Sequence, residues 1–370
     1  MAPTRVAACH VASHFLSAQK SVDKAISLIH QAAKNSANLV VFPETYLSAF
    51  PIWSAIRPPT ENHDLFHRMV QESLYADGEE VRLLQEAARE TKTVISMGFS
   101  EKYRASTACL YNSNLIINTM GEVAVHHRKL MPTFFEKLTW SPGDGYGLRV
   151  ADTPYGRVGG LICGENTNPL ARYSLMAQRE QIHISSWPPI WPTRVPASSP
   201  KEKEKEEGDR LSQGQGQGQG QAPANYDNVL ANRLRAAAHC FEAKCFGVMC
   251  SGFLGQDAID IIVSGSRSPG HVKGVLDNSP RGVSMFLDPT GTPLPSFTVE
   301  EDTKTQRPKE FLQNEEGVLY ADMDLDRCIE GKQYHDVVGG YQRLDVFQLQ
   351  VNRSRRDPVV FTEGSDIEEL

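Results

Sequence analysis

Hydrophobic and polar positions alternate between two periods along most of this chain. Short apolar runs at residues 5–12 and 38–44 are typical of buried strands. Residues 21–37 and 78–91 instead repeat apolar side chains every three or four positions, which predicts amphipathic helices. Strands that alternate with helices in this way indicate a layered α/β domain.

The same alternation continues through the rest of the chain. A hairpin is predicted around Met120 and Gly121, and a second hairpin-like pair is predicted near the end, at residues 281–294 and 315–326. Strands and helices alternate again between these hairpins. The predicted strands are residues 156–163, 181–188 and 244–252, and the predicted helices are residues 168–180 and 226–243.

One segment departs from this pattern. Residues 197–225 carry a mixed charge run followed by Gln-Gly repeats, with a single large aliphatic residue. Such a segment buries too little apolar surface to offset its ordering entropy, so we predict a disordered surface loop, with a domain linker as the alternative. Because the alternation resumes directly afterwards, we favour one domain over residues 4–326. A C-terminal extension over 327–370 follows, with a flexible tail after about residue 352.

Composition narrows the class of protein. The 370 residues are 40% hydrophobic and 22% charged, which is ordinary for a globular enzyme, and the formal net charge is -7. An acidic chain without a basic arm is not expected to need nucleic acid or an anionic membrane as a partner. The N-terminus lacks the apolar segment of a signal peptide, and no apolar run approaches about 18 residues. We therefore expect a soluble cytoplasmic protein.

The seven cysteines form no recognisable pattern. Their number is odd and no C-x-x-C pair occurs, which argues against a disulfide framework and against a structural zinc site. His10 and His14 lie four residues apart, but no third ligand lies beside them, so a metal site is not favoured there. The cysteines are therefore buried thiols, a reactive thiol, or both.

Cys163 is the cysteine with the most suggestive surroundings. A predicted strand ends at Cys163, and a helical pattern begins a few residues later, with Pro169 in its first turn. A sharp strand-to-helix turn presents a side chain at the sheet edge, where helix N-terminal amides favour a thiolate. Free cysteine is nevertheless among the most buried residue types. Local sequence alone therefore favours packing over catalysis.

A thiol nucleophile needs a proton acceptor. His126 and His127 are adjacent on a predicted strand and point to opposite faces, so at most one of them faces a site. His183 alternates with isoleucines, and no histidine has papain-like surroundings. Glu44 is the better candidate, because an apolar approach would raise its pKa toward neutrality. The alternative is a solvated residue at a strand end.

Lys129 and Glu136 extend this set of candidates. Lys129 closes the second strand of the hairpin, where it either stabilises a developing anion or extends to solvent. Glu136 lies among aromatic residues, so we expect a partly buried carboxylate that positions Lys129 or forms a structural pair. A carboxylate, an ammonium and a thiol thus follow predicted strands. Open α/β sheets place their sites at the carboxyl ends of strands.

Several stretches around these residues resemble the nitrilase (carbon-nitrogen hydrolase) superfamily. They are "VVFPETYLSAFPIW" around Glu44, "HHRKLMPTFFEKLTWSPGDG" around Lys129 and Glu136, "GLICGENTNPLARYSLMAQREQIHISSWP" around Cys163, and the later "NRLRAAAHCFEAKCFGV" and "GGYQRLDVF". The similarity covers residues 4–348 apart from the insertion. Within the superfamily, the stretch around Cys163 is most similar to fungal nitrilases.

This resemblance implies an α-β-β-α sandwich with a catalytic triad of Glu44, Lys129 and Cys163, supported by Glu136. It implies no metal or organic cofactor, and a homodimer that microbial members extend into spiral homo-oligomers. The implied reaction is hydrolysis of a small-molecule nitrile to the carboxylic acid and ammonia. Cys163 is the nucleophile of a thioimidate and then a thioester, Glu44 is the general base, and Lys129 stabilises the intermediate.

Two positions depart from the pattern of the family. Many nitrilases carry tryptophan after the nucleophile, where this chain has Gly164. We therefore predict a roomier floor beside the thiol, suited to aryl or arylaliphatic nitriles. Many also carry histidine where this chain has Gly340, which puts the contribution of that histidine in doubt. The insertion at 197–225 either obstructs an oligomer interface or, as we favour, forms a harmless loop.

Other functions stay open at this point. Amidases and carbamoylases use the same triad, although the aromatic stretches "YLSAFPIW" and "SSWPPIWPTR" favour a compact apolar nitrile. Enzymes that hydrate cyanide usually have the tryptophan that Gly164 replaces. A non-catalytic scaffold is disfavoured because Glu44, Lys129 and Cys163 are all present. Cys240, Cys245 and Cys250 are interpreted as packing residues, and Cys9, Cys109 and Cys328 have no nearby partner in the sequence.

Overall fold

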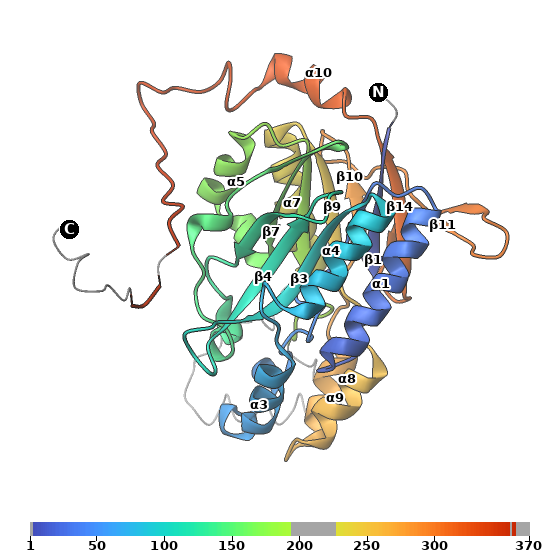
Figure 1. Cartoon of the computed structure of the whole chain (residues 1–370), viewed down its shortest axis with the longest axis vertical. Helices are drawn as coiled ribbons and strands as arrows, with labels where there is room; N and C mark the ends of the chain where they lie inside the picture. The colour runs from blue at the N-terminus through green and yellow to red at the C-terminus, as the bar shows by residue number, and fades with distance from the viewer. Residues whose placement is uncertain (1–2, 194–226, 356, 360–370) are drawn as a thin grey trace, which may run out of the picture.

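The computed structural model describes residues 3–193, 227–355 and 357–359. Two β-sheets lie face to face, and helices cover both outer faces (Figure 1). This arrangement is the α-β-β-α sandwich predicted above. The loop predicted at 197–225 lies outside the described residues, and the domain boundary at 326 stays a prediction.

Among the described residues, the first sheet has eight strands and the second has six. In spatial order, the first sheet contains β12 (Gln306–Pro308), β11 (Phe297–Val299), β14 (Gly317–Met323), β1 (Thr4–His10), β2 (Leu39–Val41), β3 (Val94–Lys102), β4 (Leu110–Ile117) and β5 (Val123–Arg128). The second contains β13 (Phe311–Leu312), β10 (Ser284–Leu287), β9 (Phe246–Ser251), β8 (Ile182–Trp187), β7 (Gly156–Ile162) and β6 (Ala151–Thr153). Strands β1, β2 and β3 are parallel, as are β7, β8 and β9.

Helices connect these strands and cover the sheets. They are α1 (Ala18–Lys34), α2 (Trp53–Ile56), α3 (His63–Glu72), α4 (Glu79–Thr91), α5 (Pro169–Met176), α7 (Asn228–Ala243), α8 (Gln256–Ser264), α9 (Pro269–Asn278) and α10 (Arg327–Tyr334). Short 3-10 turns are η1 (Pro59–Glu61), η2 (Phe134–Leu138), η3 (Gly145–Gly147) and η4 (Cys163–Thr167). Helices α1 and α4 pack on the first sheet, and α5 and α7 pack on the second.

Strand β1 shows why the central strands are apolar throughout. Val6 and Ala8 pack between the two sheets, whereas Ala7 and Cys9 pack toward α1 and α4. A strand that is covered on both faces has a nearly continuous apolar sequence. The apolar runs seen in the sequence therefore mark the middle of the sandwich.

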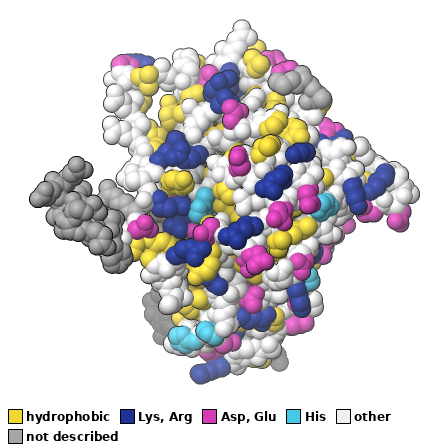
Figure 2. All heavy atoms as spheres, in the orientation of Figure 1, with side chains coloured by type: hydrophobic (Ala, Val, Ile, Leu, Met, Phe, Trp, Pro, Cys, Tyr) yellow, Lys and Arg dark blue, Asp and Glu magenta, His cyan; other side chains and the backbone are white. Residues whose placement is uncertain are grey.

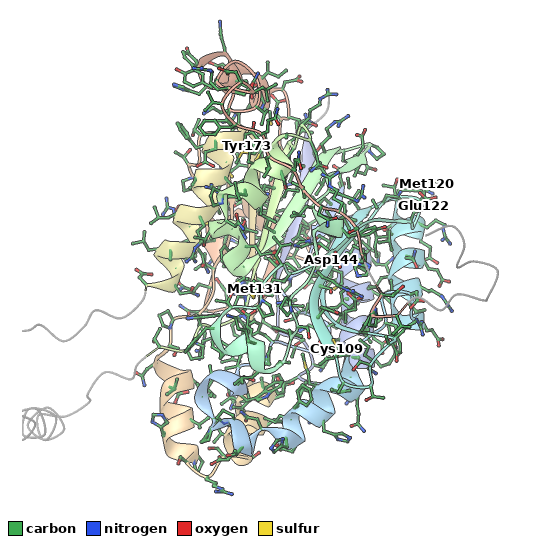
Figure 3. The ribbon with its side chains drawn as sticks, turned by 90° about the vertical axis from the view of Figure 1, so that its left-hand side faces the viewer. Cys109, Met120, Glu122, Met131, Asp144 and Tyr173 are labelled. Carbon is green, nitrogen blue, oxygen red and sulfur yellow. The ribbon has the colours of Figure 1, made fainter. Side chains whose placement is uncertain are left out.

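The first predicted hairpin is confirmed. Strands β4 and β5 pair antiparallel, and Met120 and Glu122 lie together at the turn between them (Figure 3). Gly121 between these two residues has a φ of +76°, a left-handed conformation that costs glycine little. Hydrophobic alternation with a glycine at the turn was therefore sufficient to predict this pair.

The second predicted hairpin is wrong. Strand β10 pairs with β9 and β13 in the second sheet, whereas β14 pairs with β1 and β11 in the first. Both strands are buried on both faces, so their apolar sequences do not specify a sheet. The predicted helix 168–180 is also shorter in the structure. It ends at Met176, before Arg179 turns the chain with a φ of +64°.

Helices α3, α8 and α9 lie beyond the sheets, at the lower end of the molecule in Figure 1. The loops that follow β1, β8 and β9 contribute Phe15, Ile190 and Leu254 to an apolar cluster with Ala258 of α8 and Leu65 of α3. This cluster covers the end of the sandwich where the parallel strands terminate. Side chains that follow those strands are consequently shielded from water.

The surface carries mixed charge. Figure 2 shows acidic and basic side chains interspersed across the viewed face. No helix in the described part of the chain is long and apolar enough to cross a membrane. Within the tail predicted to be flexible, Arg355 donates from Nε to Asp144 Oδ2 at 2.8 Å and contacts His126.

Candidate active site

Four residues singled out from the sequence meet at the carboxyl ends of strands from both sheets. Glu44 lies shortly after β2 and Lys129 directly after β5 in the first sheet, and Cys163 directly after β7 in the second. Glu136 comes from η2, close behind Lys129 in the chain. All four are buried, with at most 6% of each residue exposed. The catalytic roles of these residues stay predictions, but the structure brings their side chains together.

Lys129 lies at the centre of the cluster. Its Nζ donates to Glu44 Oε1 at 2.8 Å and to the two oxygens of Glu136 at 3.0 and 2.7 Å. Burial lowers the pKa of Lys129, but the negative charge that Cys163, Glu136 and Glu44 can carry outweighs burial and raises this pKa well above its ordinary value. Lys129 is therefore an ammonium held by two carboxyl groups.

Glu136 is more buried than the sequence suggested. Its side chain is fully enclosed and accepts from the backbone N–H of Thr133 at 3.0 Å in addition to Lys129. Its carboxylate thus fixes both the lysine and the start of η2. Whether Glu136 positions Lys129 for the reaction or forms a structural pair with it stays a prediction.

Glu44 has one occupied and one unoccupied oxygen. Oε1 accepts from Lys129 and from Asn112 Nδ2, the latter at 2.7 Å, whereas Oε2 has no hydrogen-bond partner among the described residues. Burial raises the pKa of Glu44 to about 7, against the opposing effect of Lys129. A carboxyl group with a free oxygen and a pKa near neutrality is suited to accept and return a proton.

Cys163 lies within reach of both carboxyl groups. Its Sγ and one oxygen each of Glu44 and Glu136 lie within 4.8 Å of one another. Its φ of +52° is in the left-handed region that non-glycine residues rarely adopt, as is typical of a tight strand-to-helix nucleophile turn. The turn predicted from the sequence is therefore present, with η4 as its first helical turn.

The amide effect expected at Cys163 is present, because the backbone N–H of Gly164 lowers the pKa of the thiol, but larger effects oppose it. Burial first, and then the charge of Glu44, raise the pKa of the thiol well above its ordinary value, although Lys129 opposes them. The thiol is therefore neutral until a base removes its proton. The local sequence predicted the turn, but it did not show how deeply the folded chain buries the Cys163 thiol. This burial determines the charge of the thiol.

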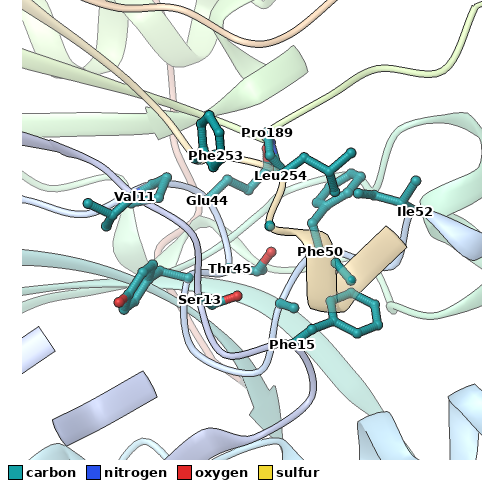
Figure 4. Close-up of a pocket in the computed structure, with 16 residues that line it drawn as sticks. Val11, Ser13, Phe15, Glu44, Thr45, Phe50, Ile52, Pro189, Phe253 and Leu254 are labelled. Carbon is teal, nitrogen blue, oxygen red and sulfur yellow. The ribbon is translucent and has the colours of Figure 1, made fainter. Parts of the chain in front are cut away.

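A small cavity reaches Glu44 from the covered end of the sandwich (Figure 4). Its volume of about 30 Å³ leaves space for about two water molecules. Phe15, Phe50, Phe253 and Leu254 contribute to its apolar wall. The cavity thus offers an apolar surround next to a proton acceptor.

Thr133 occupies the position toward which a side chain at Gly164 would point, whereas the roomier floor for substrate stays a prediction. A Cβ atom at this position would lie 2.8 Å from the Oγ1 of Thr133, so the space is already occupied. Thr133 belongs to the segment between Lys129 and Glu136, which the tertiary fold lays across the nucleophile turn. The sequence could not show this contact because the two segments are distant along the chain.

Metal binding is a poor fit to this cluster. Glu44, Glu136 and Cys163 have ligand-type atoms close together, but the Lys129 ammonium already bonds both carboxyl groups. A second group, Glu180, His239 and Cys245, is also close enough for an ion. There the Glu180 carboxylate bonds His239 at 2.6 Å and His183 at 2.8 Å. Both carboxylate sets are engaged by protein cations or imidazoles.

Sequence reasoning missed several polar residues around the cluster. Asn112 donates a hydrogen bond to Glu44. A polar side chain at a buried position of a strand is the feature that could have marked Asn112 in the sequence. His127, one of two histidines considered, bonds Glu165 with Nε2 2.9 Å from Oε2. Glu165 and Asn166 lie two and three residues after Cys163. Their spacing in the sequence did not identify them as site residues. Only the folded chain shows which backbone groups these side chains reach.

Comparison with known proteins gives full-length relatives. A family model described as carbon-nitrogen hydrolase matches residues 5–333. A nitrilase of Penicillium rubens is 33% identical over 361 residues, which cover 97% of this chain and 96% of that protein. An arylacetonitrilase of Hypocrea virens is 30% identical over 369 residues, which cover 98% of this chain and 96% of that protein.

Solved structures share the fold at lower identity. A carbon-nitrogen hydrolase from Helicobacter pylori G27 superimposes with a TM-score of 0.60 at 18% identity, covering 89% of this chain and 92% of that chain. Saccharomyces cerevisiae Nit3, a member of branch 10 of the nitrilase superfamily, has a TM-score of 0.60 at 18% identity, covering 94% and 97%. At this identity the likeness shows the fold alone.

Proposed function

The chain belongs to the carbon-nitrogen hydrolase family, and we propose that it is a nitrilase that uses Cys163, Glu44, Lys129 and Glu136 to hydrolyse a nitrile. The observation that carries the proposal is the Lys129 ammonium held between two carboxyl groups with the Cys163 thiol within reach. The full-length similarity to nitrilases and arylacetonitrilases supports the nitrile as substrate.

The first step forms the covalent intermediate. Glu44 takes the thiol proton on its unoccupied Oε2 as the sulfur of Cys163 attacks the nitrile carbon. The C≡N bond becomes C=N, and the nitrogen gains a proton from Lys129, whose positive charge stabilises the negative charge that develops there. The product is a thioimidate on Cys163. Glu136 keeps the ammonium at this position throughout.

Two water molecules complete the reaction. The proton on Glu44 first passes to Lys129, which restores the carboxylate and the ammonium. Glu44 then removes a proton from the first water, which adds to the thioimidate carbon, and delivers this proton to the nitrogen. As the C=O bond forms, the hydroxyl proton also reaches the nitrogen, and the C–N bond breaks to release ammonia and leave a thioester. A second water attacks the thioester, and the C–S bond breaks to give the carboxylic acid and the thiol. Loss of sulfur before nitrogen would instead release an amide.

The surroundings of Glu44 favour an apolar substrate. Most side chains around the cavity are aromatic or aliphatic, and the polar side chains beside Glu44 are Ser13, Thr45 and Tyr46. We propose that the carbon substituent of the nitrile lies against Phe50, Phe253 and Leu254. Because the cavity is small, a substituent the size of a phenyl ring requires these side chains to move.

Ammonia release from a panel of aliphatic, aryl and arylaceto nitriles, with the matching amides, tests the function. We expect the wild type to release ammonia from nitriles. Ammonia release by Cys163→Ala should not exceed the background rate. Turnover of amides without nitriles would identify an amidase instead. Equal rates for wild type and Cys163→Ala would rule out thiol catalysis.

We further propose that the protein forms a homodimer through α5, α7 and the C-terminal arm. Leu170 on α5 and Leu234 and Phe241 on α7 each leave more than half of their surface exposed. The arm after α10 runs along the outside of the body in Figure 1, with Tyr341 and Phe347 exposed. Exposed leucine and phenylalanine side chains on the neighbouring helices α5 and α7 are typical of an interaction surface. Sedimentation of Leu234→Asp should show monomers where the wild type shows dimers or longer assemblies.

A cytoplasmic location is also part of the proposal. All seven cysteines are free, which is usual in a reducing compartment. Fractionation of the source cells, with the protein detected by antibody, would test this location. Recovery in the secreted fraction would contradict it.

A further inference from the structure

The two residues that follow the nucleophile turn bond in different directions. Asn166 stays within the second sheet, where its Nδ2 donates to the carbonyl of Cys163 at 3.0 Å and its Oδ1 accepts from His183 and Ser185. Glu165 instead bonds to the end of β5, in the first sheet. Lys129 lies at the end of β5, and Cys163 lies at the end of β7. Glu165 therefore connects the part of the site from the first sheet with the part from the second sheet.

The bonds of Glu165 are unusually well placed for that task. Oε2 accepts from the backbone N–H of Ile162 at 2.8 Å, and Oε1 accepts from the backbone N–H of Leu130 at 2.5 Å. Ile162 is the residue directly before Cys163, and Leu130 is the residue directly after Lys129. One carboxylate therefore fixes the backbone on both sides of the thiol–ammonium pair.

His127 completes the arrangement. Its Nε2 lies 2.9 Å from Glu165 Oε2, and 97% of each side chain is buried. Burial raises the pKa of Glu165, but His127 and the two backbone N–H groups outweigh it and lower this pKa below its ordinary value. Glu165 is thus a carboxylate with every oxygen engaged, unlike Glu44.

We infer that Glu165 is a positioning residue that holds the Cys163 thiol at its working distance from Lys129 and Glu44, acting through the backbone of Ile162 and Leu130. It touches neither substrate nor thiol. The inference rests on the proposed function, since it assigns Glu165 a part in the same reaction. Misplacement of reacting groups by about 1 Å costs on the order of 10²-fold in rate.

The chain offers a matched control whose histidine partner lies on the same strand, β5. Glu101 of β3 is also a buried carboxylate that bonds a histidine of β5, with His126 Nε2 2.7 Å from its Oε2, and it bonds Arg128 as well. Its bonds do not include the nucleophile turn. Glu101→Gln therefore reports what the loss of a buried carboxylate beside β5 does to the protein in general.

The test compares Glu165→Gln, Glu101→Gln and wild type in nitrile kinetics, thermal unfolding and the rate at which iodoacetamide alkylates Cys163, followed on its peptide by mass spectrometry. A glutamine offers one acceptor, so it loses one of the two backbone bonds. For Glu165→Gln we expect kcat to fall about 10²-fold with KM within about threefold of wild type. Alkylation of Cys163 should slow about tenfold or more, because the base and the ammonium are misaligned. Glu101→Gln should keep both rates within about threefold.

Three results would overturn the inference. In the first, Glu165→Gln unfolds more easily but keeps the wild-type kcat and alkylation rate. In the second, Glu165→Gln and Glu101→Gln lose kcat and alkylation rate equally. In the third, Glu165→Gln changes only KM. If Glu165→Gln does not fold, Glu165→Asp replaces it, since aspartate keeps the charge but is too short to reach both N–H groups. Alkylation needs no nitrile turnover, so failure of the proposed function and failure of this inference are distinguishable.

Discussion

Strand β5 has a buried ionic cluster on each of its faces, and the two clusters balance their charges differently. On the face that points away from the second sheet, Glu101 accepts from His126 and Arg128, and these partners outweigh burial and lower its pKa to about 2. On the face between the sheets, Lys129 is shared by Glu44 and Glu136, and burial raises the pKa of Glu44 to about 7.

This difference distinguishes a cluster suited to a structural role from a cluster suited to proton transfer. Glu101 has two cationic or imidazole partners for one carboxylate, so its charge is fixed and its proton is not available. Glu44 and Glu136 have one ammonium between them, and the thiol nearby makes a third group that can carry negative charge. One proton is therefore mobile in the second cluster, which is what proton transfer at neutral pH requires.

Removing the ammonium should have the largest effect. In Lys129→Met, the two carboxyl groups face each other without a counter-charge and the nitrile nitrogen loses its proton donor. We expect kcat/KM to fall about 10⁴-fold in steady-state ammonia assays. A Lys129→Met enzyme within tenfold of wild type would show that the shared ammonium is not required.

Removing the base should have the next largest effect. In Glu44→Gln, the amide oxygen still accepts from Asn112 and Lys129, but nothing takes the proton of the Cys163 thiol. We expect kcat/KM to fall about 10³-fold. The wild-type kcat/KM should itself fall with decreasing pH below about 7, the pKa of Glu44, and a profile flat between pH 5 and 8 would contradict the assignment.

Stability should respond with opposite sign in the two clusters. The folded pKa of Glu101, about 2, is below its ordinary 4.5, so its contribution is present above pH 4.5 and lost as pH falls toward 2. The folded pKa of Glu44, about 7, is above 4.5, so its contribution is present below pH 4.5 and lost as pH rises through 7.

Chemical denaturation at pH 8 checks this sign. Glu101→Gln should lower the free energy of unfolding by about 3 kcal/mol, because Arg128 loses its buried partner. Glu44→Gln should leave that free energy unchanged or raise it, because a buried group that resists ionisation is gone. Equal destabilisation by both variants would remove the distinction between the clusters.

The smallest effect is expected beside the thiol. In Gly164→Ala, the new methyl group meets the Thr133 hydroxyl, which can rotate away. We expect KM for bulky nitriles to rise about threefold with little change for small ones. A lower KM of Gly164→Ala for bulky nitriles would instead support the roomier floor predicted from the sequence.

Much of the site could be predicted because its residues follow strands. Glu44, Lys129 and Cys163 each come at or soon after the end of an apolar run, and parallel strands bring such ends together. The alternation of His126 and His127 likewise predicted that only one faces the site, and His127 is the one that contacts Glu165.

The remainder depends on contacts between distant segments. Thr133 fills the space beside Gly164, and Glu165 reaches Leu130, but neither pairing follows from a local pattern. The charge of Cys163 depends on burial by the whole sandwich, which local amides do not reveal. Strands β10 and β14 were paired wrongly for the same reason, since two doubly buried strands carry similar sequences.

Mass spectrometry of protein quenched during turnover of an apolar nitrile tests the central claim most directly. We predict an adduct with the mass of the thioimidate or thioester on the peptide that contains Cys163, and no adduct on the other cysteines. The adduct should be absent from Cys163→Ala, together with ammonia release. Steady release of ammonia without modification of Cys163, or from the Cys163→Ala variant, would contradict the account.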